Sequence, residues 1–274
     1  MSARGGSALG GKIGIFDSGL GGLIIARTIR RAMPEYDYVY YGDTKRLPYG
    51  NKSHNAVFEF TREAVDYLFR KENCAIVIIA CNTASARALR QIQQEYLPKN
   101  FKDRRVLGVL IPAAEEASRY KKVGVLATLG TVSSQTFPIE IKKLNSKTKV
   151  FQNPAAMLVP LIEEGENILA KPFLLKYLQA FKNKNLDALV LGCTHYPALK
   201  KEIKKLIPKN LKIISQDEIV PKKLKEYLTR HPEITKKLSR GKSVKILVTD
   251  KTQNMDRLVE RWFGKNKVSV ILNS

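Results

Sequence analysis

The sequence predicts an α/β protein made of two similar α/β halves with mainly parallel sheets. Short apolar segments alternate with helical patterns along the chain, which is typical of parallel βαβ units. The segment 75–80 is uniformly apolar and rich in Ile and Val, as central parallel strands are. Two pairs of landmarks recur at nearly equal offsets, with Gly14 and Gly124 110 positions apart and Cys81 and Cys193 112 positions apart. This repetition indicates an ancient duplication, and it predicts that the two halves face each other across a shared cleft.

The first half is predicted to contain three strands, each followed by a helix. The strands are expected at 12–16, 38–41 and 75–80, and the helices at 25–33, 57–68 and 84–98. Pro34 and Pro98 are expected to stop two of these helices. A polar loop punctuated by Pro and Gly is expected over 42–50.

The second half is predicted to continue the alternation, and the chain then adds two late strands. In chain order we expect strands at 106–111, 123–127, 189–191, 211–214, 244–248 and 268–272, with helical segments at 160–165, 173–181 and 199–207. We expect a strand to end at Pro112 and a short helix to precede Val123.

The predicted organisation has three parts. Residues 1–11 are expected to form a flexible Gly/Ser tail. The first α/β domain is expected to combine 12–105 with 216–274, and the second to comprise 106–215.

Composition excludes several classes of protein. No apolar run approaches the length of a membrane span, and the N-terminus lacks the apolar region of a secretory signal. Three cysteines are too few for a disulfide framework and lack a metal-ligand spacing, so we expect free thiols, no metal and a cytoplasmic location. The 274 residues are enough to bury one large core or two modest ones.

The formal charge of +23 leaves two interpretations open. It could mark a surface for nucleic acid or another acidic partner. We favour a solvated, lysine-rich surface, because the excess is mainly Lys and comes without an aromatic stacking platform or an Arg-rich reading helix.

Cys81 and Cys193 are the leading candidates for chemistry. Each follows a predicted strand and precedes a helix-compatible segment, where backbone amides and the helix dipole favour a thiolate. Free cysteine is also often a small core residue, and Cys74, which lacks this context, is interpreted that way. The paired context favours the functional interpretation for the other two.

Polar residues are expected at the same strand ends. Asp17 and His195 are candidate proton handlers, although Asp17 could simply cap the next helix. The turn Gly19–Gly22 is a weak phosphate-binding candidate, because it lacks the full dinucleotide spacing and the Walker lysine. Hydroxyl and amide groups that suit a small ligand with carboxylates and an ammonium group, or that could equally cap helices, come from Ser18, Asn82, Thr83, Thr128, Thr131 and Thr194.

Four ordered motifs resemble glutamate racemases closely, and the resemblance spans essentially the chain from Lys12 onward. The motifs are Phe16-Asp-Ser-Gly-Leu-Gly-Gly22, Tyr41-Gly-Asp-Thr-Lys-Arg-Leu-Pro-Tyr-Gly50, Ala80-Cys-Asn-Thr-Ala84 and Leu191-Gly-Cys-Thr-His-Tyr-Pro197. The resemblance implies two α/β domains related by pseudo-two-fold symmetry, with the active site between them. It also implies a racemase that needs no cofactor and supplies D-glutamate for peptidoglycan.

The resemblance also assigns roles to residues. Cys81 and Cys193 match the acid/base thiols, and Glu163 matches an acidic residue near the second thiol. Matches to substrate-contacting positions are Asp17, Ser18, Tyr49, Gly50, Asn82, Thr83, Thr128, Thr131, Thr194 and His195. The expected partners are glutamate and a second copy of the chain in a homodimer, with no membrane.

Two departures from the family pattern are Asn153-Pro154 and Ser215–Glu218. They put dimer packing or regulation in doubt, and leave the chemistry intact. A racemase for aspartate is the nearest alternative, but aspartate racemases tend to carry Glu where this chain has His195. A basic nucleic-acid-binding or topoisomerase-binding protein is the alternative from another class.

Overall fold

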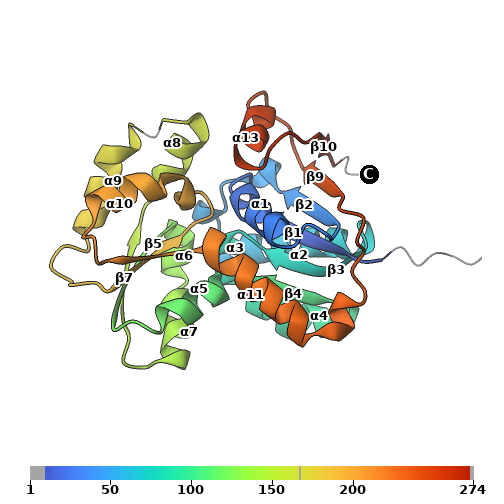
Figure 1. Ribbon diagram of the computed structural model, residues 1–274, viewed down its shortest axis with the longest axis horizontal. Coiled ribbons are helices and arrows are strands. Elements are labelled where there is room, and N and C mark those ends of the chain that lie inside the picture. The colour runs from blue at the N-terminus through green and yellow to red at the C-terminus, as the bar shows by residue number, and fades with distance from the viewer. Residues whose placement is uncertain (1–9, 167, 272–274) are drawn as a thin grey trace, which may run out of the picture.

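The computed structural model describes residues 10–166 and 168–271, and its strands form two parallel sheets side by side (Figure 1). The larger sheet has the strand order β10-β9-β2-β1-β3-β4. Its strands are β1 (Lys12–Asp17), β2 (Tyr38–Gly42), β3 (Cys74–Ile79), β4 (Arg105–Gly108), β9 (Val244–Val248) and β10 (Val268–Val270). Every pairing in this sheet is parallel.

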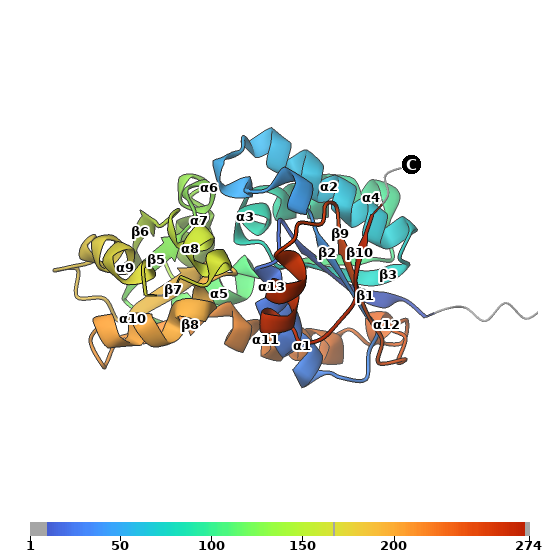
Figure 2. The ribbon, with the colours of Figure 1, turned by 90° about the horizontal axis from the view of Figure 1, so that it is seen from above.

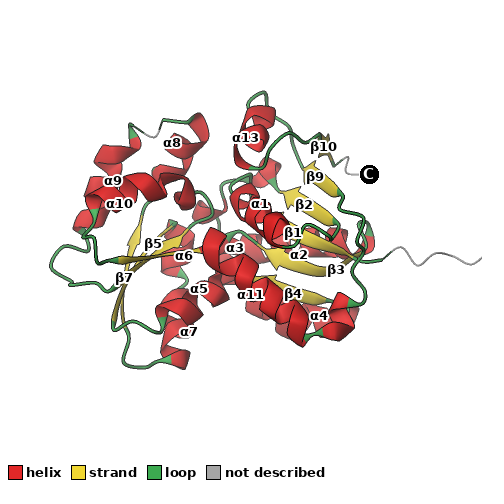
Figure 3. Ribbon diagram, in the orientation of Figure 1, coloured by secondary structure: helices red, strands yellow, loops and turns green. Residues whose placement is uncertain are grey.

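Helices cover both faces of the larger sheet, as buried parallel strands require (Figures 1 and 3). Apolar residues of one face pack with α1 (Gly22–Ala32), α11 (Gln216–Arg230) and α13 (Met255–Trp262). Those of the other face pack with α2 (His54–Arg70) and α3 (Asn82–Gln91). Further elements beside this sheet are the turns Thr44–Arg46 and Tyr49–Asn51, a π-helical turn Ile92–Tyr96, α4 (Leu97–Asn100) and α12 (Pro232–Thr235).

The smaller sheet has the order β6-β5-β7-β8 and is also parallel throughout. Its strands are β5 (Lys122–Ala127), β6 (Lys149–Pro154), β7 (Ala188–Gly192) and β8 (Lys212–Ser215). One face packs with α5 (Leu110–Ala117) and α7 (Thr136–Leu144), and the other with α8 (Leu158–Glu164), α9 (Ala170–Gln179) and α10 (Lys200–Leu206). The short helix α6 (Leu129–Ser133) and the turn Tyr196–Leu199 follow β5 and β7. Seen from above, this unit lies beside the first, with α3 and α5 between the sheets (Figure 2).

The two sheets repeat one topology. The order β2-β1-β3-β4 in the first corresponds to β6-β5-β7-β8 in the second. Gly14 pairs with Val39 and Val77 across β1, and Gly124 occupies the matching central place in β5. The prediction of two similar, parallel α/β units is confirmed.

Several boundaries differ from the sequence prediction. The strand expected over 106–111 ends at Gly108, because α5 already begins at Leu110 and accommodates Pro112 in its first turn, where no backbone N–H is needed. Val106 pairs with Val77, so β4 belongs to the larger sheet and crosses the domain boundary expected between 105 and 106. The helix expected to stop at Pro98 continues to Asn100, because Pro98 lies in the first turn of α4.

The start of the first unit contacts a late segment of the chain. Residues 1–9 of the expected tail lie outside the described residues, whereas Gly11 forms a bridge with Leu238 and so departs from the expected flexibility. No described helix is both long and apolar enough to cross a bilayer.

Candidate active site

A pocket of about 350 Å³ lies where the carboxyl ends of the two sheets' strands meet. Parallel sheets bind ligands at this end. Of the predicted site residues, those that line it are Ser18, Tyr49, Gly50, Cys81, Asn82, Thr83, Thr128, Glu163, Cys193, Thr194 and His195. Asp17 and Thr131 do not line it.

Cys81 caps helix α3 and is nearly buried. Its sulfur accepts hydrogen bonds from the Ala84 amide at 3.5 Å and from the Ser18 hydroxyl at 3.3 Å. The sequence predicts a thiolate here, but burial, assisted by nearby Asp17, raises the pKa of Cys81 to about 12. The two hydrogen bonds act in the opposite direction and are outweighed. In the free protein Cys81 is therefore a neutral thiol.

Cys193 has different surroundings from Cys81. Only a 3-10 turn, Tyr196–Leu199, follows it, and α10 does not begin until Lys200, so the helix start predicted to favour a thiolate at this cysteine is not adjacent to it. Its sulfur instead lies 3.7 Å from Nδ1 of His195. The two cysteines thus occupy similar places in the topology with different chemical neighbours.

His195 connects Cys193 to an acidic residue. Its Nε2–H donates to Oε1 of Glu163 on α8 at 2.9 Å. Burial alone would lower the pKa of His195, but Cys193 and Glu163 together outweigh it and raise that pKa well above its usual range. The imidazolium form is therefore favoured, and its Nδ1 faces the Cys193 sulfur.

The glycine-rich turn after β1 receives His195. A Cβ built at Gly21 would lie 2.4 Å from both Cε1 and Nδ1 of the imidazole. Glycine is needed at this position because the ring approaches the backbone so closely. The turn Gly19–Gly22, a weak phosphate-binding candidate in the sequence, thus packs against His195.

Asp17 lies completely buried beneath the pocket. Its Oδ2 accepts hydrogen bonds from the Gly19 and Gly22 amides at 3.1 Å each, and the second of these is at the start of α1. Its Oδ1 has no hydrogen-bond partner among the described residues. Burial raises the pKa of Asp17, although the charge of His195 and these amide bonds oppose the rise. Asp17 therefore accepts a hydrogen bond from the first amide of α1, as a capping residue would, and it also lies near Cys81 and His195.

Three threonine hydroxyls join the two units at the pocket. Thr83 at the start of α3 lies 2.8 Å from Thr128 and 3.4 Å from Thr131, oxygen to oxygen, and the latter two are 3.0 Å apart. Thr128 also caps α6 by accepting from the Thr131 amide. Thr131 does not reach the pocket itself and supports Thr83 and Thr128 through these hydroxyl contacts.

Other groups support the pocket walls. The Tyr49 hydroxyl donates to Asp43 Oδ2 at 2.5 Å, which fixes the turn that presents Gly50. The buried Asn82 amide exchanges hydrogen bonds with Gln216, the first residue of α11. Sequence reasoning missed Gln216, although it lies in the segment Ser215–Glu218 that departs from the family pattern.

Sequence reasoning also missed the apolar rim and a packing partner of His195. Leu47, Leu129 and Met157 line the pocket mouth and are each more than two-fifths exposed. Trp262 of α13 packs edge to face against His195, with the ring centroids 5.5 Å apart. No motif signalled these residues, because their roles depend on contacts between distant elements.

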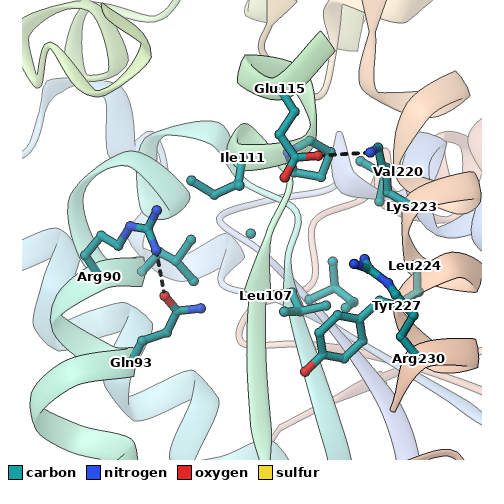
Figure 4. Close-up of a pocket in the computed structure, with 14 residues that line it drawn as sticks. Arg90, Gln93, Leu107, Ile111, Glu115, Val220, Lys223, Leu224, Tyr227 and Arg230 are labelled. Carbon is teal, nitrogen blue, oxygen red and sulfur yellow. Dashed lines mark hydrogen bonds and ion pairs between the residues drawn. The ribbon is translucent and has the colours of Figure 1, made fainter. Parts of the chain in front are cut away.

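A second, smaller cavity of about 160 Å³ lies away from this pocket, between α3, α5 and α11 (Figure 4). Its labelled residues include Arg90, Glu115 and Lys223. Among the described residues, no group of three or more His, Cys, Asp or Glu side chains could hold a metal ion.

Fold and site together define a protein of two parallel α/β units that presents one thiol from each to a shared pocket. Such a pocket suits proton transfer at opposite sides of a small ligand. A family model described as Asp/Glu/Hydantoin racemase matches residues 24–218. The chain belongs to this family, and it is an amino-acid racemase, an isomerase.

Known proteins resemble the chain over nearly its whole length. A glutamate racemase of Sulfurihydrogenibium sp. is 38% identical over 264 residues, covering 94% of this chain and 96% of that protein. One from Aquifex aeolicus is 35% identical over 260 residues, covering 93% and 94%. The crystal structure of a Francisella tularensis glutamate racemase in complex with D-glutamate superposes with a TM-score of 0.87, at 31% identity, covering 96% and 98%.

Proposed function

We propose that this protein interconverts L- and D-glutamate without a cofactor, using Cys81 and Cys193 as its acid and base. The observation that carries the proposal is the pair of thiols, one from the end of β3 and one from the end of β7, lining one pocket. The similarity to glutamate racemases over more than nine-tenths of the chain supports glutamate as the substrate.

The pocket lining suits this substrate. Hydroxyl and amide groups from Ser18, Asn82, Thr83 and Thr194 offer hydrogen bonds to carboxylates and to an ammonium group. Only a small volume, about 350 Å³, is present, which fits a small amino acid better than a larger ligand.

The contrasting surroundings of the thiols support different resting roles for them. Cys193, beside the cationic His195, acts as the thiolate that removes the α-proton of L-glutamate. Cys81, held as a neutral thiol, donates a proton to the opposite face of the planar carbanion and yields D-glutamate. The reverse direction starts with the proton on Cys193 and the negative charge on Cys81.

Neighbouring residues serve these two steps. Glu163 holds His195 through Nε2, so that Nδ1 faces the Cys193 sulfur. Ser18 donates to Cys81 and stabilises its thiolate when that form is needed. Tyr49, Gly50, Thr83 and Thr128 form the substrate-holding wall, and Thr131 supports the two threonines from behind.

The wider role follows from the resemblance. We propose that the D-glutamate supplies peptidoglycan synthesis in the cytoplasm, and that the enzyme acts as a homodimer. Light scattering of the purified protein tests the dimer.

Circular dichroism of L-glutamate and L-aspartate, each incubated with purified protein without added cofactor, tests the activity. Decay of the L-glutamate signal to zero is the expected result, with no decay for L-aspartate. Decay for aspartate alone would favour the alternative substrate. A requirement for zinc or pyridoxal phosphate would contradict the cofactor-free mechanism.

A further inference from the structure

We propose that Arg87 is a positioning residue that fastens the first turn of α6, and with it Thr128, against α3 and the Tyr49–Asn51 turn. Arg87 lies on α3, one turn beyond Thr83. It does not line the pocket, so it acts through residues that do. This inference rests on the proposed function, because it explains how the substrate-holding wall keeps its shape.

The guanidinium of Arg87 binds three separate places. Its Nη1–H donates to the Lys52 carbonyl oxygen, which follows the turn that presents Gly50. Its Nε–H donates to the Gly130 carbonyl oxygen at 3.2 Å, and Nη2–H donates to Ser133 Oγ at 3.0 Å. Two of the three bonds therefore reach α6 of the second unit, and the third reaches the first unit.

All three acceptors are uncharged. No carboxylate among the residues that the structure describes lies within ion-pair distance of Arg87, although most described arginines that bridge elements have one. The side chain is half-buried, and its planar fork suits several simultaneous bonds. Arg87 therefore links separate backbone segments through hydrogen bonds, and no acidic side chain among the described residues neutralises its charge.

The junction that Arg87 holds is tightly packed. A Cβ built at Gly130 would lie 2.9 Å from the Gly50 carbonyl oxygen, 3.0 Å from Thr83 Cγ2 and 3.4 Å from Arg87 Cζ. Gly130 lies between Thr128 and Thr131, so bonding its carbonyl fixes the turn that carries both hydroxyls. Since the three threonines come from both units, a displaced α6 would open the hydroxyl triangle.

Arg90 provides a matched control on the same helix. It also joins α3 to the second unit, through Nε and Nη2 to Glu140 of α7 at 3.1 and 2.8 Å. It lines the other cavity, where Figure 4 shows it beside Gln93. Substituting Arg90 loosens the units away from the active site, whereas substituting Arg87 loosens them at the threonines.

The kinetic test compares Arg87→Gln with Arg90→Gln. Arg87→Gln is expected to raise KM for both glutamate enantiomers about tenfold, with a much smaller change in kcat, because about two net hydrogen bonds to α6 are lost and neither thiol is touched. Arg90→Gln is expected to leave both constants near wild type. Equal effects of the two variants would overturn the proposal, as would an unchanged KM in Arg87→Gln.

Arg87→Lys separates bonding from charge. It keeps the cation but cannot make the three-way contact, so we expect it to behave like Arg87→Gln. Recovery of the wild-type KM by lysine would show that charge alone matters and would refute the positioning role.

Hydrogen exchange supplies a readout that does not depend on racemase activity. Arg87→Gln is expected to speed amide exchange over 49–52 and 128–135, whereas Arg90→Gln should speed it over 136–144. If Arg87→Gln fails to fold, Gly130→Ala crowds the same junction and should give the same rise in KM. Unchanged exchange over 128–135 would overturn the inference even if the protein racemises another substrate.

Discussion

The substitution Glu163→Gln tests whether Glu163 keeps His195 protonated beside Cys193. It removes the negative charge that holds His195 Nε2–H while keeping the size of the side chain. A hydrogen bond to a charged group contributes about 1.5–3 kcal/mol, and the lower end applies because the Glu163 side chain is 28% exposed. About 1.4 kcal/mol corresponds to one pKa unit, so we expect the pKa of His195 to fall by about 1.

The sign of the pH effect follows from the raised pKa of His195. The folded protein holds this proton more tightly than the unfolded chain, so the interaction stabilises the fold fully below the ordinary histidine pKa and is lost as pH rises through the raised value. In Glu163→Gln the contribution should be smaller and that loss should be complete at lower pH. The fraction of imidazolium beside Cys193 falls about tenfold only at pH above the raised pKa, so the alkaline decline of kcat should begin about one pH unit lower, while kcat near neutral pH should change little.

Nuclear magnetic resonance titration measures the pKa directly, because the chain has only three histidines and His195→Asn identifies the relevant signal. Glu164→Gln is the matched control, since Glu164 is exposed and no bond joins it to His195. A pKa of His195 that stays unchanged in Glu163→Gln, or shifts equally in Glu164→Gln, would refute the reasoning. The ratio kcat/KM must stay equal in both directions for every variant, because the enantiomers have equal free energy in water.

Three further predictions concern the same pocket. Trp262 is the single tryptophan and lies against His195, so its fluorescence should rise as alkaline pH removes the quenching imidazolium, and should lack this transition in His195→Asn. Cys81→Ser is expected to lower racemisation about 10³-fold, while Cys193 still exchanges solvent deuterium into L-glutamate. Cys193→Ser should lose racemisation similarly and still exchange deuterium into D-glutamate. Substantial racemisation by either variant would contradict the two-base mechanism. Gly21→Ala places a Cβ against the His195 ring and should cost about 1–3 kcal/mol of folding free energy and most of the activity, which a wild-type melting temperature and kcat would disprove.

The strand pattern was predictable where burial dictated composition. The apolar run of β3 indicated a central strand, and the nearly equal offsets from Gly14 to Gly124 and from Cys81 to Cys193 indicated the repeated topology. Strand β6 escaped prediction, because its residues are half-exposed at an edge and include Gln152 and Asn153. Edge strands carry little of the apolar signal on which such prediction depends.

Helix starts were predictable only in part. Proline was interpreted as a stop at Pro98 and Pro112, whereas both occupy first turns that have no N–H to lose. Helices α7, α11 and α13 were not predicted. The interior Pro221 of α11 weakens its local signal, and the helix is stabilised by packing against α1 and α5.

The candidate pocket was largely predictable because its residues follow strand ends. The charge state of Cys81 was not, since a motif shows the helix start but not the burial that opposes ionisation. Arg87 and Gln216 were missed for a related reason. Their partners lie 43 and 134 positions away, and no local pattern reports such pairs.

The position of β9 constrains the order in which the protein can be completed during synthesis. Strand β2 needs β9 as its neighbour, with Tyr40 paired to Ile246, and Asp43 receives a hydrogen bond from Thr249 only once that segment exists. A nascent chain that has released β1 to β4 from the ribosome therefore exposes an unpaired edge at β2 while the entire second unit is made. Exposed strand edges invite association with other chains. Chaperone dependence of this protein should accordingly be concentrated in the interval before residue 248 emerges.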